Sequence, residues 1–373
     1  MIIMALDHVR DLMHLNSITQ SPTDLTTTTP LLFFTRWITH LCAPIFVFLA
    51  GTSAYISLKR KNDFISTKKH LLERGLFLLL LEFTVVNFVL FFDIGFHTIL
   101  FEVIASTGLG FIILSLLLKL PTRYLGYIGL IIIFGHNLTP VIPFAENSLI
   151  KSILIPFFSP SAIPLFAGKV FVMGYPPIPW FGIMLVGFAC GHFFELADKQ
   201  RKKLFLNIGI GSLLLFVAIR YVNIYGDSLQ GSAQKDSLYT FLSFVNVTKY
   251  PPSLAFCLVT LGIMFLLLAF VENFNKRFQQ ISMVYGKVPL FYFIAHFYLV
   301  HSITLAMLFF QGFHWSQLEF ATGTFGRPKD IESGLPLWEI YVVWIGVVIT
   351  LYRPCKWFGY YKATHKKWWL NYI

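Results

Sequence analysis

Long apolar segments constrain this chain more than any other feature of its sequence. A helix that crosses a bilayer needs about 20 mostly apolar residues, and nine segments provide them: 33–58, 75–92, 98–118, 124–142, 178–195, 204–222, 253–272, 287–310 and 337–353. The opening residues add a tenth, shorter candidate. Only 13% of the residues are charged, against roughly 25% in soluble domains. The sequence therefore predicts one all-α domain over residues 1–373, a polytopic integral membrane protein with about ten transmembrane helices.

Lysine and arginine residues predict how these helices are oriented. They collect in segments 59–74, 119–123, 198–203 and 275–287 and in the tail from Arg353, and such enrichment marks cytoplasmic loops. All of these segments fall on one side only if the chain crosses ten times, which puts both termini in the cytoplasm. The net charge of +11 is therefore mainly a topology signal. It also suits anionic lipid or a phosphorylated ligand, and nucleic acid is not an expected partner.

The first helix carries many ionisable residues. The stretch MALDHVRDLMHLN, residues 4–16, contains Asp7, His8, Arg10, Asp11 and His14. At 100° per residue they occupy an arc of about 160°, opposite an apolar side. Each charge at bilayer depth costs about 2.5–3.5 kcal/mol, and such residues usually face a bundle interior or a wet cavity. We expect this face to line a polar cavity. The alternative is an ion pair of Arg10 with Asp7 or Asp11 that only joins helices.

Polar residues in other predicted spans could meet this face. They are Arg36 and His40 at the outer end of the second span, Glu82 in the third, Glu102 in the fourth, and His296 and His301 in the ninth. Isolated buried charges would each need a partner of their own, so a shared cavity is expected. The candidates for binding substrate or stabilising an oxyanion are Arg10, His14, Arg36, His40, Glu82, His296 and His301.

His8 and its neighbouring carboxylates suggest general-base chemistry. A histidine that a carboxylate holds in one tautomer can take a proton from a hydroxyl or an amine. Asp11, three residues on, could reach the His8 ring, whereas Asp7 points about 100° away. The catalytic candidates are therefore His8, Asp11 and Asp7. No metal is expected, because neither HxxxH nor HExxH stands on one helix.

A transporter is the rival interpretation of the same residues. Intramembrane Asp, Glu and His side chains are the usual parts of proton relays. A proton-coupled transporter or flippase of a small anionic or lipid-linked substrate therefore stays open, although the two halves of the chain show no matching pair of broken helices. A non-catalytic assembly partner is a third alternative.

Four connections on the predicted outer side are long: 15–32, 143–177, 223–252 and 312–336. Loops longer than about 12–15 residues are usually functional or disordered, so a bulky substrate is expected to dock on this side. Segment 150–177 is half apolar and rich in proline. It suggests an interfacial or re-entrant piece over a cavity, and an ordered lid on the bilayer surface is the alternative.

Several strings in the chain resemble a known family. LDHVRD (6–11), ERGLFLLLLEFTVVNF (73–88), PWFGIMLVGFACG (179–191) and YGKVPLFYFIAHFYLVH (285–301) are similar to bacterial relatives of heparan-alpha-glucosaminide N-acetyltransferase, and the similarity runs over nearly the whole chain. The resemblance implies a transmembrane acyltransferase of ten or eleven helices in the bacterial cytoplasmic (inner) membrane. Such an enzyme would pass an acyl group, expected to be acetyl, from coenzyme A in the cytoplasm to a glycan or other acceptor beyond the membrane.

The first helix is also similar to that of membrane acyltransferases that O-acylate bacterial surface sugars. There an Arg-Gly pair precedes a catalytic histidine by about three turns, so the resemblance implies that His8 is the general base. The Arg-Gly half of the helix is absent here, as though translation had been assigned to an internal Met. The animal lysosomal enzyme has asparagine at the position of His8 and a histidine in the following loop, where this chain has none.

The resulting hypothesis joins these residues in one reaction. Acetyl-CoA or another acyl-CoA is the co-substrate, with Arg74 and Lys287 drawing its phosphates, although both could be topology anchors instead. His8, oriented by Asp11, deprotonates the acceptor, and Arg10 or Arg36 stabilises the oxyanion. Direct transfer and an acyl-histidine intermediate both stay open. Expected partners are acyl-CoA, the acceptor and the lipid bilayer, and a homodimer is not excluded.

Overall fold

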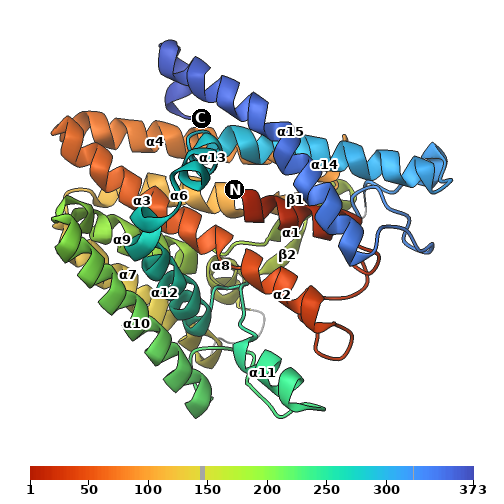
Figure 1. The fold of residues 1–373 in the computed structure, drawn as a ribbon, viewed down its shortest axis with the longest axis horizontal. Helices are drawn as coiled ribbons and strands as arrows, with labels where there is room; N and C mark the ends of the chain where they lie inside the picture. Colours follow the sequence, from red (N-terminus) through yellow and green to blue (C-terminus); the bar gives the residue numbers. More distant parts are fainter. Residues whose placement is uncertain (143–147, 322) are drawn as a thin grey trace.

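Helices form most of the computed structural model, which describes residues 1–142, 148–321 and 323–373 (Figure 1). They are α1 (Ile2–Met13), α2 (Pro30–Thr39), α3 (Cys42–Lys61), α4 (Phe64–Leu81), α5 (Asn87–Phe91), α6 (Val103–Leu117), α7 (Thr122–Gly135), α8 (Leu149–Phe158), α9 (Pro177–Cys190), α10 (Asp198–Val222), α11 (Ser237–Val245), α12 (Leu254–Phe270), α13 (Lys276–Gly286), α14 (Pro289–Phe310) and α15 (Leu337–Thr364). The described residues also form three short strands: β1 (Thr98–Phe101), β2 (Ser161–Pro164) and β3 (Val170–Met173).

Eight helical segments in the described part of the chain are long and apolar enough to cross a membrane. They are Pro30–Lys61, Phe64–Phe91, Thr122–Val141, Pro177–Glu195, Asp198–Val222, Leu254–Asn273, Pro289–Phe310 and Leu337–Thr364. The prediction of an all-α polytopic membrane protein is confirmed. The count of about ten is reached only by adding the shorter helices α6 and α1 to these eight.

The predicted second span is interrupted. Helix α2 ends at Thr39 and α3 begins at Cys42. Pro44 lies in the first turn of α3, where its ring would clash with the carbonyl of His40, four residues earlier, if one helix ran through. The break separates α2, the outer part of this segment that carries Arg36, from α3 (Figure 1).

The predicted fourth span also starts differently from expectation. Its first residues, Thr98–Phe101, form β1, which pairs in parallel with β3, and β2 pairs antiparallel with β3. The loop predicted to be an interfacial or re-entrant piece contains this hairpin and α8, whose Leu149 and Ile150 are exposed. Residues 143–147 of this loop and residue 322 of the last long loop lie outside the described residues.

The two largest apolar cores of the described residues hold most of the helices together. The first lies among α3, α4, α6, α7, α9, α10 and α12 and includes Trp180 and Phe256. The second lies among α1, α5, α14 and α15 and includes Tyr292 and Phe297. Within the first core, α3 and α9 approach closely at Gly187, where an added Cβ would overlap the backbone of Phe48. Small residues at such crossings allow helices to pack backbone to backbone in membranes.

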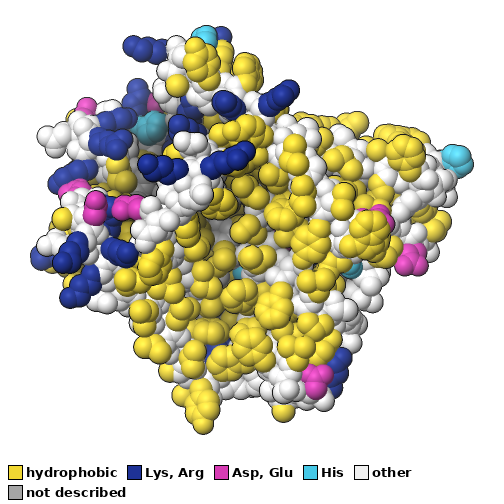
Figure 2. All heavy atoms as spheres, viewed as in Figure 1, with side chains coloured by type: hydrophobic (Ala, Val, Ile, Leu, Met, Phe, Trp, Pro, Cys, Tyr) yellow, Lys and Arg dark blue, Asp and Glu magenta, His cyan; other side chains and the backbone are white. Residues whose placement is uncertain are grey.

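Lysine and arginine side chains gather at one end of the molecule (Figure 2). We call this the basic end; it contains residues 59–63, 119–123, 196–203, 271–277 and 353–367. The sides of the bundle seen in Figure 2 are mostly hydrophobic, as expected for helices that contact lipid. We call the opposite end, where the loops 14–29 and 223–252 lie, the loop end.

Candidate functional site

Helix α1 packs against α2, α14 and α15. The indole nitrogen of Trp344 donates a hydrogen bond to the carbonyl of Ile2, 2.8 Å away, and the backbone N–H of Leu335 bonds to the carbonyl of Met13. Because Leu335 lies two residues before the start of α15 and Trp344 lies two turns into it, α1 runs beside the half of α15 nearest the loop end. The polar face of α1 is therefore placed among the helices and not on the lipid-facing surface.

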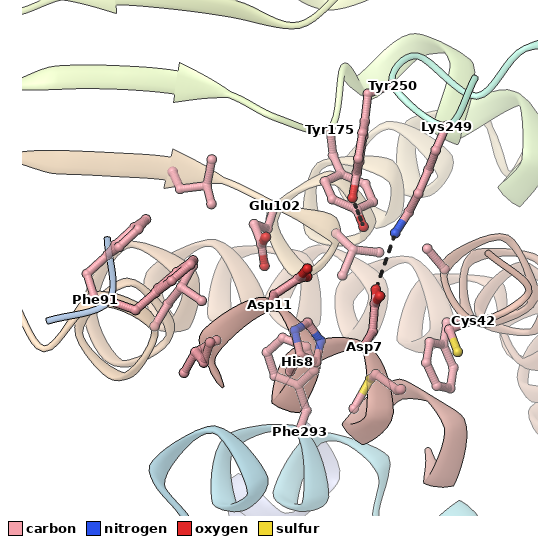
Figure 3. Close-up of a pocket in the computed structure, with 18 residues that line it drawn as sticks. Asp7, His8, Asp11, Cys42, Phe91, Glu102, Tyr175, Lys249, Tyr250 and Phe293 are labelled. Atoms are coloured by element: carbon pink, nitrogen blue, oxygen red, sulfur yellow. Dashed lines mark hydrogen bonds and ion pairs between the residues drawn. The ribbon is translucent and has the colours of Figure 1, made fainter. Parts of the chain in front are cut away.

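A cavity of about 130 Å³ lies against this polar face (Figure 3). Helix α1 contributes three polar residues to its lining, and the segments before α6, α9 and α12 contribute the others. They are Asp7, His8 and Asp11 of α1, Glu102 before α6, Tyr175 before α9, and Lys249 and Tyr250 before α12. The remaining wall is apolar and comes from both cores, with Ala43 from the first and Leu12, Leu90 and Phe293 from the second. The cavity thus lies where the two cores meet, and the predicted polar lining by α1 is present.

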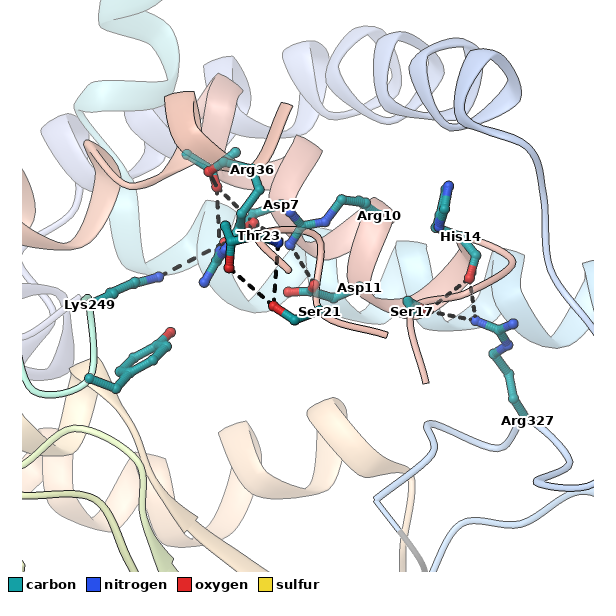
Figure 4. A network of polar contacts seen from close by, with 12 residues as sticks. Asp7, Arg10, Asp11, His14, Ser17, Ser21, Thr23, Arg36, Lys249 and Arg327 are labelled. Carbon is teal, nitrogen blue, oxygen red and sulfur yellow. Dashed lines mark hydrogen bonds and ion pairs between the residues drawn. The ribbon is translucent and has the colours of Figure 1, made fainter. Parts of the chain in front are cut away.

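Asp7 is the centre of an ion-pair network (Figure 4). Its carboxylate accepts hydrogen bonds from Arg10 at 2.8 Å, from Arg36 at 2.6 and 2.7 Å, and from the hydroxyl of Thr39 at 2.8 Å. The ammonium group of Lys249 lies 4.0 Å away. Asp7 is only 7% exposed, so these donors replace the water that its charge would otherwise require. The network ties α1 to α2 and to the loop before α12.

The predicted hydrogen bond between Asp11 and His8 is not formed. Asp11 accepts instead from Arg10, at 2.5 Å. The physical reason is charge balance, because Arg10 and Arg36 together need two carboxylates and Asp7 supplies only one. Arg10 does form the ion pairs considered as the alternative, but with Asp7 and Asp11 of its own helix. The ion pair that joins two helices is that of Asp7 with Arg36 on α2.

The His8 ring is held by aromatic contacts. It lies 4.2 Å from the ring of Phe297 and 5.1 Å from the ring of His296, both on α14. Across the described residues, neither nitrogen of His8 has a hydrogen-bond partner. His8 also lines the cavity, so its ring nitrogens are free to meet a substrate there.

His296 supports His8 from α14. Its Nδ1 lies 3.0 Å from the carbonyl of Tyr292 and therefore carries a hydrogen, because a carbonyl can only accept. Its buried Nε2 has no hydrogen-bond partner in the described structure. His301, in contrast, stacks on Phe92 at 3.8 Å and bonds to the carbonyl of Val89. It packs α14 on α5 and does not line the cavity.

A second hollow of about 280 Å³ continues the cavity towards the loop end. The two share Asp11, Lys249 and Tyr250, and the second is also lined by Arg36 and His40. We call this second hollow the vestibule. Its other walls come from the loops 14–29 and 223–252, so a substrate can approach the cavity from the loop end.

Two other predicted residues lie outside the cavity. Glu82 is fully buried and accepts backbone hydrogen bonds from Glu102 and Ala105, both at 3.2 Å. It thereby caps the start of α6 and fixes the position of Glu102. His14 follows α1, where Arg327 donates to its carbonyl at 2.8 Å. Burial lowers the pKa of His14, which favours the neutral form of the ring.

The two predicted coenzyme-binding residues are separated. Arg74 lies on α4 towards the basic end, with its guanidinium 5.3 Å from the centre of the Phe111 ring. Its buried Nε has no hydrogen-bond partner among the described residues. Lys287 lines a different groove, between α13 and α15. No cluster of three or more His, Cys, Asp or Glu side chains able to hold a metal ion occurs in the described ranges.

Three residues of the cavity were missed by sequence reasoning: Tyr175, Lys249 and Tyr250. Glu102 was noticed in its span but was not assigned to the site. Lys249 has a signal in the sequence, since a lysine in a predicted outer loop opposes the usual distribution of charge. In the structure it is 8% exposed and lies 5.0 Å from the ring centre of Tyr250. The two tyrosine hydroxyls lie 3.3 Å apart.

These features define a helical membrane protein with an internal cavity whose polar lining includes a histidine and several carboxylates, and which adjoins the vestibule. The family model described as heparan-alpha-glucosaminide N-acetyltransferase, catalytic, matches residues 1–225. The chain belongs to this family, and the predicted resemblance is confirmed. The family implies transferase activity. The matched region includes α1, α2 and Glu102, whereas Lys249 and α14 follow it. No curated protein matches the chain.

Proposed function

We propose that this protein transfers an acetyl group from acetyl-CoA to an amino sugar or another acceptor on the outer side of the bacterial inner membrane. The basic end faces the cytoplasm in this proposal, because lysine and arginine mark cytoplasmic loops. The vestibule then faces outward. The observation that carries the proposal is the position of His8, a histidine without a hydrogen-bond partner in the described structure, on a cavity within the region that matches the acetyltransferase family.

His8 acts as the general base. An unpaired ring nitrogen can accept the proton of the acceptor's amino or hydroxyl group as that group attacks the thioester carbonyl. The protonated ring can then return the proton to the departing thiolate. His296 keeps the His8 ring in place, and its own Nδ1 is committed to Tyr292. Acetyl-CoA supplies the activated acyl group, and the residues of this chain supply proton transfer and orientation.

Lys249 is the cation best placed to stabilise the oxyanion. Arg10 and Arg36, the earlier candidates, are bound to Asp7 and Asp11. The ammonium of Lys249 lies 4.0 Å from Asp7 and lines both the cavity and the vestibule. A buried cation at a site shielded from water stabilises developing negative charge strongly. Asp7 and Asp11 position the arginines and the lysine in this scheme and do not react themselves.

In this proposal Glu102 binds the acceptor and Arg74 binds coenzyme A. Glu102 points into the cavity beside Asp11 (Figure 3), so its carboxylate can accept a hydrogen bond from the acceptor. Arg74, with its unpartnered Nε, offers a cation towards the basic end, where the phosphates of coenzyme A would arrive. Phosphates prefer guanidinium groups because the planar fork binds two oxygens at once.

Acetyl transfer by the purified protein tests this function. The protein in detergent is incubated with acetyl-labelled coenzyme A and a glucosamine-terminated oligosaccharide, and labelled product is measured. We expect labelled amide to accumulate and acetyl-CoA to raise the midpoint of thermal unfolding by binding the folded state. A transporter has no reason to show either effect, so the absence of both would favour that alternative.

A further inference from the structure

A groove of about 410 Å³ runs between α13 and α15 at the basic end. Its walls combine apolar and small residues with two lysines: Gln280, Met283, Val284, Lys287, Cys355, Lys356, Gly359, Tyr360 and Ala363. None of these residues lines the cavity or the vestibule. The groove is therefore separate from the proposed reaction site.

Helix α13 has the character of an interfacial helix. It begins with Lys276 and Arg277, and it exposes Phe278 and Met283, which are 58% and 49% exposed. Exposed apolar side chains next to basic ones are typical of helices that lie at the boundary between headgroups and acyl chains. On its other side, Tyr285 is buried against α15, donating to the carbonyl of Val348.

The position of the groove along α15 matches the same boundary. At 1.5 Å per residue, Cys355 lies about 27 Å from Leu337, the first residue of α15. A hydrocarbon core about 30 Å thick therefore ends close to Cys355. Lys356 and Tyr360 then lie at headgroup depth.

The groove carries a positive charge from two lysines. Lys287 and Lys356 are exposed, and neither forms an ion pair with any described residue. None of the residues lining the groove is acidic. We propose that this groove binds an anionic phospholipid of the adjoining leaflet, with its phosphate at Lys287 and Lys356 and an acyl chain along Met283 and Gly359. In this arrangement the lysines bind the anionic headgroup, and the apolar wall beside them contacts the acyl chain.

Lipid binding by the whole purified protein tests the proposal. Native mass spectrometry is used to compare phosphatidylglycerol and phosphatidylcholine with identical acyl chains. We expect a preference for phosphatidylglycerol in the natural protein. The double variant Lys287→Gln, Lys356→Gln should bind phosphatidylglycerol about 30-fold more weakly, because each lysine near an anionic surface contributes about fivefold.

A matched control removes the same charge elsewhere at the basic end. Lys199 and Lys203 on α10 are exposed and do not line the groove, so the pair Lys199→Gln, Lys203→Gln should keep the full preference. Equal weakening by both pairs, or equal binding of the two lipids by the natural protein, would overturn the proposal. Displacement of the lipid by free coenzyme A, lost in the groove variant, would make the groove a coenzyme site instead.

A second variant tests the proposed position of the acyl chain without removing a charge. A Cβ on Gly359 would contact only Val288, at 3.8 Å, so Gly359→Leu can be accommodated and extends into the groove. We expect it to weaken phosphatidylglycerol binding at least tenfold while the midpoint of thermal unfolding is unchanged. Acetyl transfer should continue in the Gly359→Leu variant, which separates this proposal from the proposed function. Unchanged lipid binding by Gly359→Leu would contradict the assigned position of the chain.

Discussion

At the scale of single residues, two aspartates and two arginines decide the character of the site. Asp7 and Asp11 neutralise Arg10 and Arg36. Lys249 faces the cavity with its ammonium 4.0 Å from Asp7, and His8 and Glu102 face it without an ion pair to any described residue. The sequence predicted that α1 has a polar face and left an ion pair of Arg10 open as the alternative role of that face. It did not predict which carboxylate meets which cation, because that choice depends on Arg36 and Lys249, which come from other elements.

Removal of the Asp7 charge should destabilise the protein. Asp7→Asn leaves Arg36 and Arg10 buried with one carboxylate between them, and breaking a buried ion pair costs about 3–5 kcal/mol. We expect a large drop in the midpoint of thermal unfolding in detergent. The control Asp198→Asn removes a carboxylate that is 80% exposed, in a pair with Arg201, and should change the midpoint little. Equal midpoints for the two variants would contradict the central role given to Asp7.

Lys249 should affect the rate of transfer and not the fold. Lys249→Met keeps the length of the side chain but removes its charge, so we expect kcat for acetyl transfer to fall about 100-fold, the loss typical of an oxyanion-stabilising donor. Lys235→Met, in the same long loop but over the ring of Tyr239, is the matched control. If both variants retained the natural kcat, the assignment of Lys249 to the oxyanion would be wrong.

At the scale of elements, apolar length predicted most helices, and two interruptions escaped it. The break between α2 and α3 could have been predicted from Pro44, because its ring would clash with the carbonyl of His40 in a continuous helix. The replacement of the start of the fourth span by β1 could not have been predicted in this way. That strand exists because β3, some 70 residues later, pairs with it, and Glu82 on the preceding helix caps α6.

The crossing of α3 and α9 gives a test at this scale. Gly187→Leu would place a side chain where the backbone of Phe48 now lies. Overpacking typically costs about 1–3 kcal/mol, and we expect a cost at the upper end because the clash is with backbone atoms. We expect little folded protein after purification, measured by size-exclusion chromatography. The control is Gly211→Leu on α10, where an added Cβ meets nothing within 4 Å. Similar yields of the two variants would show that this crossing does not need glycine.

At the scale of the whole molecule, the two cores divide the helices into two groups, and the cavity lies between the groups. Chain order does not predict this division, because α1 joins α14 and α15 from the far end of the sequence. The distribution of lysine and arginine did predict that one end would be basic, and Figure 2 shows that end. Family membership adds the reaction class, whereas the acceptor must be found by experiment.

The central claim is that His8 is the base for acetyl transfer, and the rate of the His8→Ala variant tests it most directly. We expect kcat to fall about 10²–10⁴-fold, the usual contribution of a general base, while acetyl-CoA still raises the midpoint of thermal unfolding. His192→Gln, an exposed histidine at the basic end, should transfer acetyl at the natural rate. A folded His8→Ala protein that acetylates its acceptor as fast as the natural protein would contradict the account.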